Sequence, residues 1–143
     1  KSLDDKDALV DMYIRGIDFC LEHDYPSNDF IRENFKGVME KHGVFLDDAI
    51  ALQDQSKCIA LGTTNGKVTA TGYSVSEVWA KHDSALNIVA KDNAFVMVDV
   101  YDNAVVNVIA SDRAKVCVNH HGGKVIQKAT GDAVVKIREK SNK

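Results

Sequence analysis

The spacing of hydrophobic residues divides the chain into two parts. Over residues 1–56 the apolar side chains recur every three or four positions, which is the period of one face of an amphipathic helix. Over residues 57–143 Val, Ile and Ala alternate with polar residues between Gly, Asp and Asn, a pattern typical of short strands joined by turns. We therefore expect a helical N-terminal cap over residues 1–56 and a β repeat region over residues 57–143.

The N-terminal cap is predicted to contain two or three α-helices. The first begins at a capping box formed by Ser2 and Asp5 and ends before Pro26. The second helical segment covers residues 27–43, from a serine that favours a helix start to a glycine that favours a helix end, and Gly37 can divide it. Both segments are amphipathic, so each needs an apolar surface to pack against.

The second part of the chain repeats a unit of nine or ten residues. Each unit begins with a turn residue, Asp or Gly, and continues with alternating apolar positions. The units are DSALNIVAK from Asp83, DNAFVMVDVY from Asp92, DNAVVNVIAS from Asp102, DRAKVCVNHH from Asp112, GGKVIQKAT from Gly122 and GDAVVKIREK from Gly131. A fixed short period of this kind indicates a repeat architecture.

The alternation within the units assigns side chains to two faces. The inward residues are small or medium-sized, as in Ala94, Val96, Val98 and Val100, Ala104, Val106, Val108 and Ala110, and Ala114, Val116 and Val118. Because the same level recurs in each unit, we favour a β-solenoid with parallel strands, a flattened β-roll with two units per coil or a triangular β-helix with three. The alternative is an antiparallel meander, since Asp-Asn and Gly-Gly turns also suit hairpins.

The repeat units also resemble those of a known group of proteins. DNAFVMVDVY, DNAVVNVIAS and GDAVVKIREK are similar to the rungs of small, uncharacterised short-repeat β-solenoid proteins of gut Bacteroidales and their phages. In that group an N-terminal helical part precedes the rungs. The resemblance covers residues 57–140 and implies a β-helical shape, with no activity or functional residues to carry over.

Composition places the chain among folded proteins of a reducing compartment. It has 143 residues, about one domain, with 45% hydrophobic and 27% charged residues. Cys20, Cys58 and Cys117 are widely spaced and match no metal-binding or disulfide pattern. No apolar run approaches the ~20 residues that span a membrane. We therefore expect a cytoplasmic protein without a membrane partner.

The recurrent acids Asp83, Asp92, Asp102, Asp112 and Asp132 are the first candidates for a chemical role. They could form a calcium ladder, but that repeat requires several glycines around each Asp, and the chain has a single Gly-Gly pair. Asp also suits tight turns, because it hydrogen-bonds nearby backbone and tolerates left-handed conformations. We therefore interpret these acids as turn residues.

The remaining polar candidates give no catalytic constellation. His120 and His121 are adjacent, so on a strand they point to opposite faces and cannot easily hold one ion. Cys117 has Lys115 nearby on the outward face, but no motif pairs it with a base. We therefore expect no cofactor, no metal and no enzymatic activity.

Charge and exposed apolar residues point instead to binding. Residues 1–56 carry 6 Lys and Arg against 13 Asp and Glu, whereas residues 57–143 carry 12 against 8. The candidate anion-binding residues are Arg113, Lys115, Lys124, Lys136 and Arg138. The candidate apolar patch, which could seat the helices or a partner, is formed by Trp79, Phe95, Met97 and Tyr101.

Two functions follow from these features as expectations. The preferred one is a structural or protein-interaction module that binds a protein partner or forms a homo-oligomer. The other is binding of an anionic ligand or nucleic acid by the basic C-terminal units. The lack of aromatic residues after Tyr101 speaks against stacking on single-stranded nucleic acid.

Overall fold

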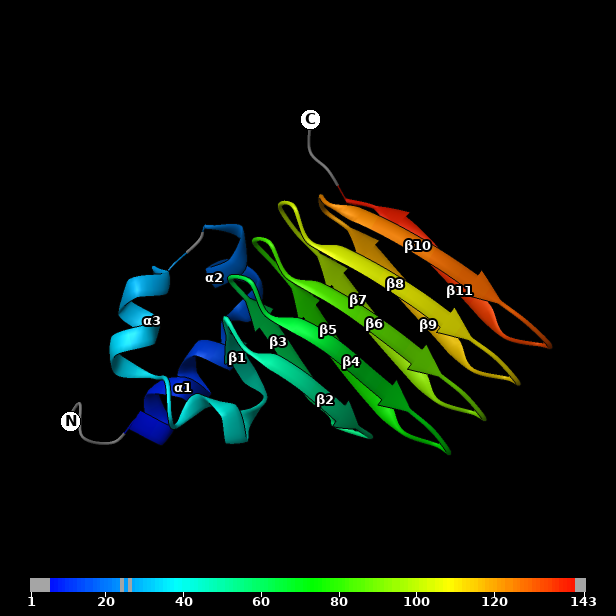
Figure 1. The fold of residues 1–143 in the computed structure, drawn as a ribbon, viewed down its shortest axis with the longest axis horizontal. Helices are drawn as coiled ribbons and strands as arrows, with labels where there is room; N and C mark the ends of the chain where they lie inside the picture. Colours follow the sequence, from blue (N-terminus) through cyan, green and yellow to red (C-terminus); the bar gives the residue numbers. More distant parts are fainter. Residues whose placement is uncertain (1–5, 24, 26, 141–143) are drawn as a thin grey trace.

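The strands wind into a β-solenoid of about five turns, with two parallel sheets facing each other across a narrow core (Figure 1). The computed structural model describes residues 6–23, 25 and 27–140. Sheet A contains β1 (Val44–Leu46), β3 (Lys57–Leu61), β5 (Val75–Ala80), β7 (Phe95–Val100), β9 (Lys115–His120) and β11 (Val134–Glu139). Sheet B contains β2 (Ala49–Gln53), β4 (Asn65–Ala70), β6 (Ala85–Ala90), β8 (Val105–Ala110) and β10 (Lys124–Ala129).

Two sequence units make one coil, so the solenoid is the flattened form. Successive units alternate between the sheets, and paired residues of the middle coils are 20 apart in sequence, as with Val75 opposite Phe95. The spacing is 15 or 16 in the first coil and 19 where β10 and β11 pair with β8 and β9. Each neighbouring pair of strands is parallel. The parallel solenoid is therefore confirmed, and the antiparallel meander is wrong.

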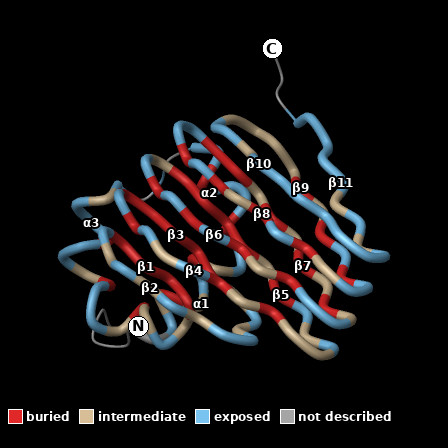
Figure 2. The backbone as a smooth tube through the Cα atoms, turned by 45° about the vertical axis from the view of Figure 1, so that its right-hand side comes forward, coloured by how far each residue is buried: buried red, intermediate tan, exposed pale blue. Residues whose placement is uncertain are grey.

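The interior contains the residues that the alternation placed there. Val96, Val98 and Val100 from sheet A pack against Val106 and Val108 from sheet B, and all are buried. Buried positions alternate along the strands of the middle coils and give way to exposed ones in β10 and β11 (Figure 2). The core is thus one continuous column of small apolar side chains.

The solenoid begins earlier than residue 57, the expected boundary. β1 and β2 precede that residue and pair with β3 and β4. β1 is only three residues long and all three are buried, so it shows no alternation that would mark a strand. The region assigned to the helical cap therefore contains the first coil as well.

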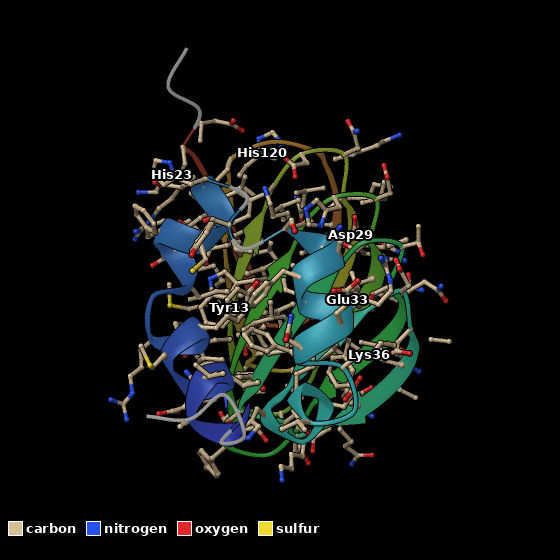
Figure 3. The ribbon with its side chains drawn as sticks, turned by 90° about the vertical axis from the view of Figure 1, so that its left-hand side faces the viewer. Tyr13, His23, Asp29, Glu33, Lys36 and His120 are labelled. Atoms are coloured by element: carbon tan, nitrogen blue, oxygen red, sulfur yellow. The ribbon has the colours of Figure 1, made fainter. Side chains whose placement is uncertain are left out.

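Three α-helices precede the strands and stand at the N-terminal end of the stack, in front of the sheets in Figure 3. They are α1 (Lys6–Arg15), α2 (Ile17–Glu22) and α3 (Asn28–Asn34), followed by the 3-10 helix η1 (Met39–His42). The first predicted helix is thus divided at Gly16. The Ser2–Asp5 capping box and Pro26 lie outside the described residues.

The predicted limits of the second helical segment are confirmed. Ser27 is the N-cap of α3, and its hydroxyl accepts a hydrogen bond from the Phe30 amide at 3.2 Å. Gly43 ends η1 in the left-handed region with φ of 89°. The segment is interrupted near Gly37, as the sequence suggested, so α3 and η1 are separate.

Candidate interaction surface

The outer face of sheet A is covered by the helices over its first strands. Large apolar residues point outward from β1 and β3, and the helices supply the matching residues. The resulting cluster contains Val10, Tyr13, Ile17, Leu21, Ile31, Phe35 and Met39 from the helical segment with Val44, Leu46, Ile59, Leu61, Trp79 and Tyr101 from the solenoid. In Figure 3, Tyr13 lies between α1 and α3, and its ring meets Phe35 edge-on at 6.0 Å.

The four residues of the predicted apolar patch are divided by this cover. Trp79 and Tyr101 are only 6% and 5% exposed because they belong to the cluster under the helices. Phe95 and Met97 lie on the same outer face but outside that cluster, and they remain half-buried. Trp79 and Tyr101 therefore form part of the helix seat, and the four do not make one exposed surface.

A cleft of about 850 Å³ lies where α2 ends over β5, β7 and β9. Its polar side chains contact one another. Lys81 Nζ lies 2.8 Å from an Asp102 carboxylate oxygen, and His121 Nε2 lies 2.9 Å from Asp99 Oδ1. The Tyr101 ring stacks on the His121 ring at 4.2 Å, between these two pairs. Two of the charged or polar pairs that line the cleft are therefore matched within the protein.

The phenol of Tyr101 reflects this crowded environment. Burial raises the pKa of Tyr101, and the negative charges of Asp99, Asp18 and Glu22 raise it further. The phenol is therefore protonated at neutral pH.

None of the described helices covers the outer face of sheet B. Its central strands, β6 and β8, present only uncharged side chains, and we call these residues the bare face: Ala85, Asn87, Val89, Val105, Asn107 and Ile109. Val105 and Ile109 are 37% and 41% exposed. Asn107 Nδ2 donates to Asn87 Oδ1 at 3.2 Å along the middle of the face. The lysines within the strands of this sheet are on the flanking strands β4 and β10, and exposed Lys91 directly follows the end of β6.

The five candidate anion-binding residues do not come together. Lys115, Lys136 and Arg138 project from the outer face of sheet A, on β9 and β11. Lys124 projects from sheet B, and Arg113 lies in a turn where its Nε donates to Asn93 Oδ1 at 3.1 Å. Lys136 and Arg138 do share a face, as the alternation predicted, but the set is spread over two faces and one turn.

The recurrent acids act as turn residues, as expected. Asp92, Asp102 and Asp112 adopt left-handed φ values between 56° and 60°. Their carboxylates accept backbone N–H groups from the preceding coil, for example Asp92 N to Asp112 Oδ2 at 3.2 Å. Asp83 and Asp132 follow His82 and Gly131, which take the left-handed position there. Turn chemistry thus explains the periodic acids.

The histidines and cysteines are placed apart as well. His120 contacts Glu139 at 2.7 Å and the Gly123 carbonyl at 2.8 Å, whereas His121 faces Asp99. The side chains of the pair therefore have different partners. The three cysteines are free, and burial raises the pKa of Cys58 to about 12. Over residues 6–23, 25 and 27–140, no group of three His, Cys, Asp or Glu side chains is placed to hold a metal ion.

Comparison with known proteins adds no assignment to these surfaces. Searches against protein-family models, curated proteins and solved structures found no match to this chain. None of the helices in the described part of the chain is long and apolar enough to cross a membrane.

Proposed function

We propose that this protein is a non-enzymatic interaction module and that the bare face of sheet B binds a protein. The observation that carries the proposal is the combination of exposure and lack of charge on β6 and β8. A flat surface with exposed Val105 and Ile109 and no outward charge over two adjacent strands is costly to leave in water. Contact with a protein surface would remove that cost.

The character of this face supports a protein partner over a small molecule. Small ligands bind in concave sites that surround most of their surface, whereas this face is the outside of a sheet. Interfaces between proteins have a core depleted of charged residues and a polar rim. The bare face, with Lys67 on one side and Lys124 and Lys128 on the other, has that organisation.

A double variant tests the proposal. Val105→Lys with Ile109→Lys places two charges at the centre of the bare face without disturbing the core, because both side chains point outward. Val75→Lys is the matched control, since Val75 is also an exposed strand valine, 62% exposed, but on sheet A. Wild type and both variants are compared by light scattering and by affinity capture from a lysate with identification of the bound proteins.

We expect the double variant to lose the oligomer or the captured partner that wild type shows, and the Val75→Lys control to keep it. The reason is that a buried lysine without a counter-charge opposes association. Equal behaviour of wild type and the double variant in both measurements would overturn the assignment of the bare face.

A further inference from the structure

We infer that the partner on the bare face is a second copy of this chain, related by a two-fold axis that runs parallel to the strands between β6 and β8. This inference rests on the proposed function and adds the identity and orientation of the partner. It is carried by the register of the outward side chains across sheet B. Face-to-face packing of two sheets, about 10 Å apart with nearly aligned strands, is a common arrangement.

The outward side chains of sheet B form three rows across its strands. The parallel register aligns Asn65, Ala85, Val105 and Lys124 in the first row, Lys67, Asn87, Asn107 and Ile126 in the second, and Thr69, Val89, Ile109 and Lys128 in the third. Each row has two uncharged residues in its middle. Each row also has its lysine at one end only, at β4 in the second row and at β10 in the other two.

A two-fold rotation about an axis parallel to the strands brings the lysine end of each row over the lysine-free end of the same row in the partner. It keeps each row in place and reverses the order of the strands, so β6 lies over the partner's β8 and β4 over the partner's β10. Lys67 then faces the partner's Ile126, and Thr69 faces the partner's Lys128. Every lysine of these three rows thus lies on an outer strand of the contact, where its ammonium reaches water beside an uncharged residue of the other copy, and no like charges are opposed.

The same rotation also matches side-chain size at the centre. Ala85 faces the partner's Val105, and Val89 faces the partner's Ile109, so a smaller residue lies opposite a larger one. Asn87 faces the partner's Asn107, which allows amide hydrogen bonds across the interface. A two-fold axis perpendicular to the strands would instead place Lys67 over the partner's Lys67. The charge pattern therefore selects one of the two face-to-face arrangements.

The covered face of sheet A determines that the assembly closes. The helices pack on its first strands, so the two sheets of one chain are not equivalent surfaces. A two-fold interface uses the same patch on both copies and leaves no further patch of that kind exposed. We therefore infer a closed dimer rather than a filament.

Substitution of Thr69 tests the arrangement. Thr69 is half-buried on the outer face of β4, in line with Gln53 and Val89 across the sheet, and Lys67 is the charged residue beside it on the same strand and face. Thr69→Lys would bring a second ammonium against the partner's Lys128, twice in the dimer. Thr69→Glu would bring a carboxylate to the same place, and Thr69→Gln is the uncharged control of similar size. The dimer dissociation constant is measured by sedimentation equilibrium at low and high salt.

We expect Thr69→Lys to raise the dissociation constant about tenfold relative to Thr69→Gln, because two repulsive pairs form at the rim. Thr69→Glu should bind as tightly as Thr69→Gln or more tightly. At high salt the dissociation constants of the three variants should converge, because salt screens the added charges. Circular dichroism of each variant confirms that the monomer is folded.

The outcomes separate this inference from the proposed function. A wild-type dimer that dissociates in Val105→Lys/Ile109→Lys but responds equally to all three Thr69 substitutions would keep the bare face and overturn the axis. A monomeric wild type would overturn the second copy, while the capture experiment still decides whether the bare face binds another protein. A dimer that persists in the double variant would overturn both.

Discussion

The two sheets of the solenoid share one interior but differ on their outer faces. Outward positions on the first strands of sheet A carry Ile59, Leu61 and Trp79, which lie under the helices. Outward positions on β6 and β8 of sheet B carry aliphatic and amide side chains, and none of the described helices covers them. The inward side of a repeat therefore builds the fold, and the outward side decides what each sheet contacts.

This difference shows that one repeat pattern can carry two kinds of outer surface. The inward positions tolerate little change, because each coil must fit the coils beside it in a closely packed core. The outward positions are free of that constraint. Large aromatic residues on sheet A can therefore pack against the helices, and uncharged residues on sheet B can contact a partner.

The largest effect is expected where sheet A meets the helices. Trp79→Ala should lower the free energy of unfolding by about 3–5 kcal/mol, because it removes a large buried aromatic side chain and leaves a cavity beneath the helices. It also removes the hydrogen bond of 3.3 Å from Trp79 Nε1 to Asp18. Chemical denaturation measures the loss, and limited proteolysis reports release of the helical segment.

The matched substitution on the bare face is Ile109→Ala. At dilutions where the chain is monomeric, it should change the free energy of unfolding by no more than about 0.5 kcal/mol, since the side chain is already exposed. Similar losses of unfolding free energy for Trp79→Ala and Ile109→Ala would show that the two outer faces contribute equally to the stability of the fold, which would contradict this prediction.

An intermediate loss of stability is expected at the turns, each of which connects a strand of one sheet to a strand of the other. Asp112 has φ of 60°, between β8 and β9. Asp112→Ala should destabilise by about 1–2 kcal/mol, because alanine disfavours this backbone conformation. Asp112→Asn should lie close to wild type, since asparagine tolerates the conformation and retains an acceptor for the Asp92 amide. Thermal unfolding of both variants decides whether conformation or charge matters at this position.

The smallest effect concerns the end of sheet A that lies away from the helices. The Glu139 carboxylate, and next the Gly123 carbonyl, raise the pKa of His120 above its ordinary value of 6.5. The folded state therefore binds the proton more tightly, and this stabilisation is fully present below pH 6.5 and is lost as the pH rises through the folded pKa. Because Glu139 is mostly exposed, the effect should be about 0.5 kcal/mol or less.

Replacement of His120 by Gln should remove this pH dependence. The free energy of unfolding is measured for wild type and His120→Gln in one buffer series, from mildly acidic to mildly alkaline pH. The difference in the free energy of unfolding between wild type and His120→Gln should shrink as the pH rises. A difference that grows with pH would mean that the neutral imidazole, rather than the charged one, stabilises the last coil.

The residues of the solenoid interior could be predicted from the sequence, whereas the character of its outer faces could not. Val96, Val98 and Val106 could be placed inward because alternation is a local property of a strand. β1 was missed because three consecutive buried residues contain no alternation. The resemblance to short-repeat proteins of gut Bacteroidales and their phages stays an expectation.

The bare face could not be recognised from the sequence for a topological reason. Phe95 and Val105 occupy equivalent outward positions in successive units, and only the number of units per coil shows that they lie on opposite sheets. The seat of the helices likewise depends on contacts between residues distant in sequence, such as the hydrogen bond from Trp79 to Asp18. Local patterns do not contain this information.

The two-unit coil has a consequence for how such a chain can change over evolutionary time. Duplication or deletion of a single ten-residue unit would preserve the alternation and the core, yet it would transfer every later unit to the other sheet. The outward residues of β8, for example, would then continue the surface of sheet A. Only gains and losses of whole coils, 20 residues long in the middle of the solenoid, keep each outer surface intact. The smallest repeat visible in the sequence is therefore half of the smallest segment that can be inherited without exchanging the two faces.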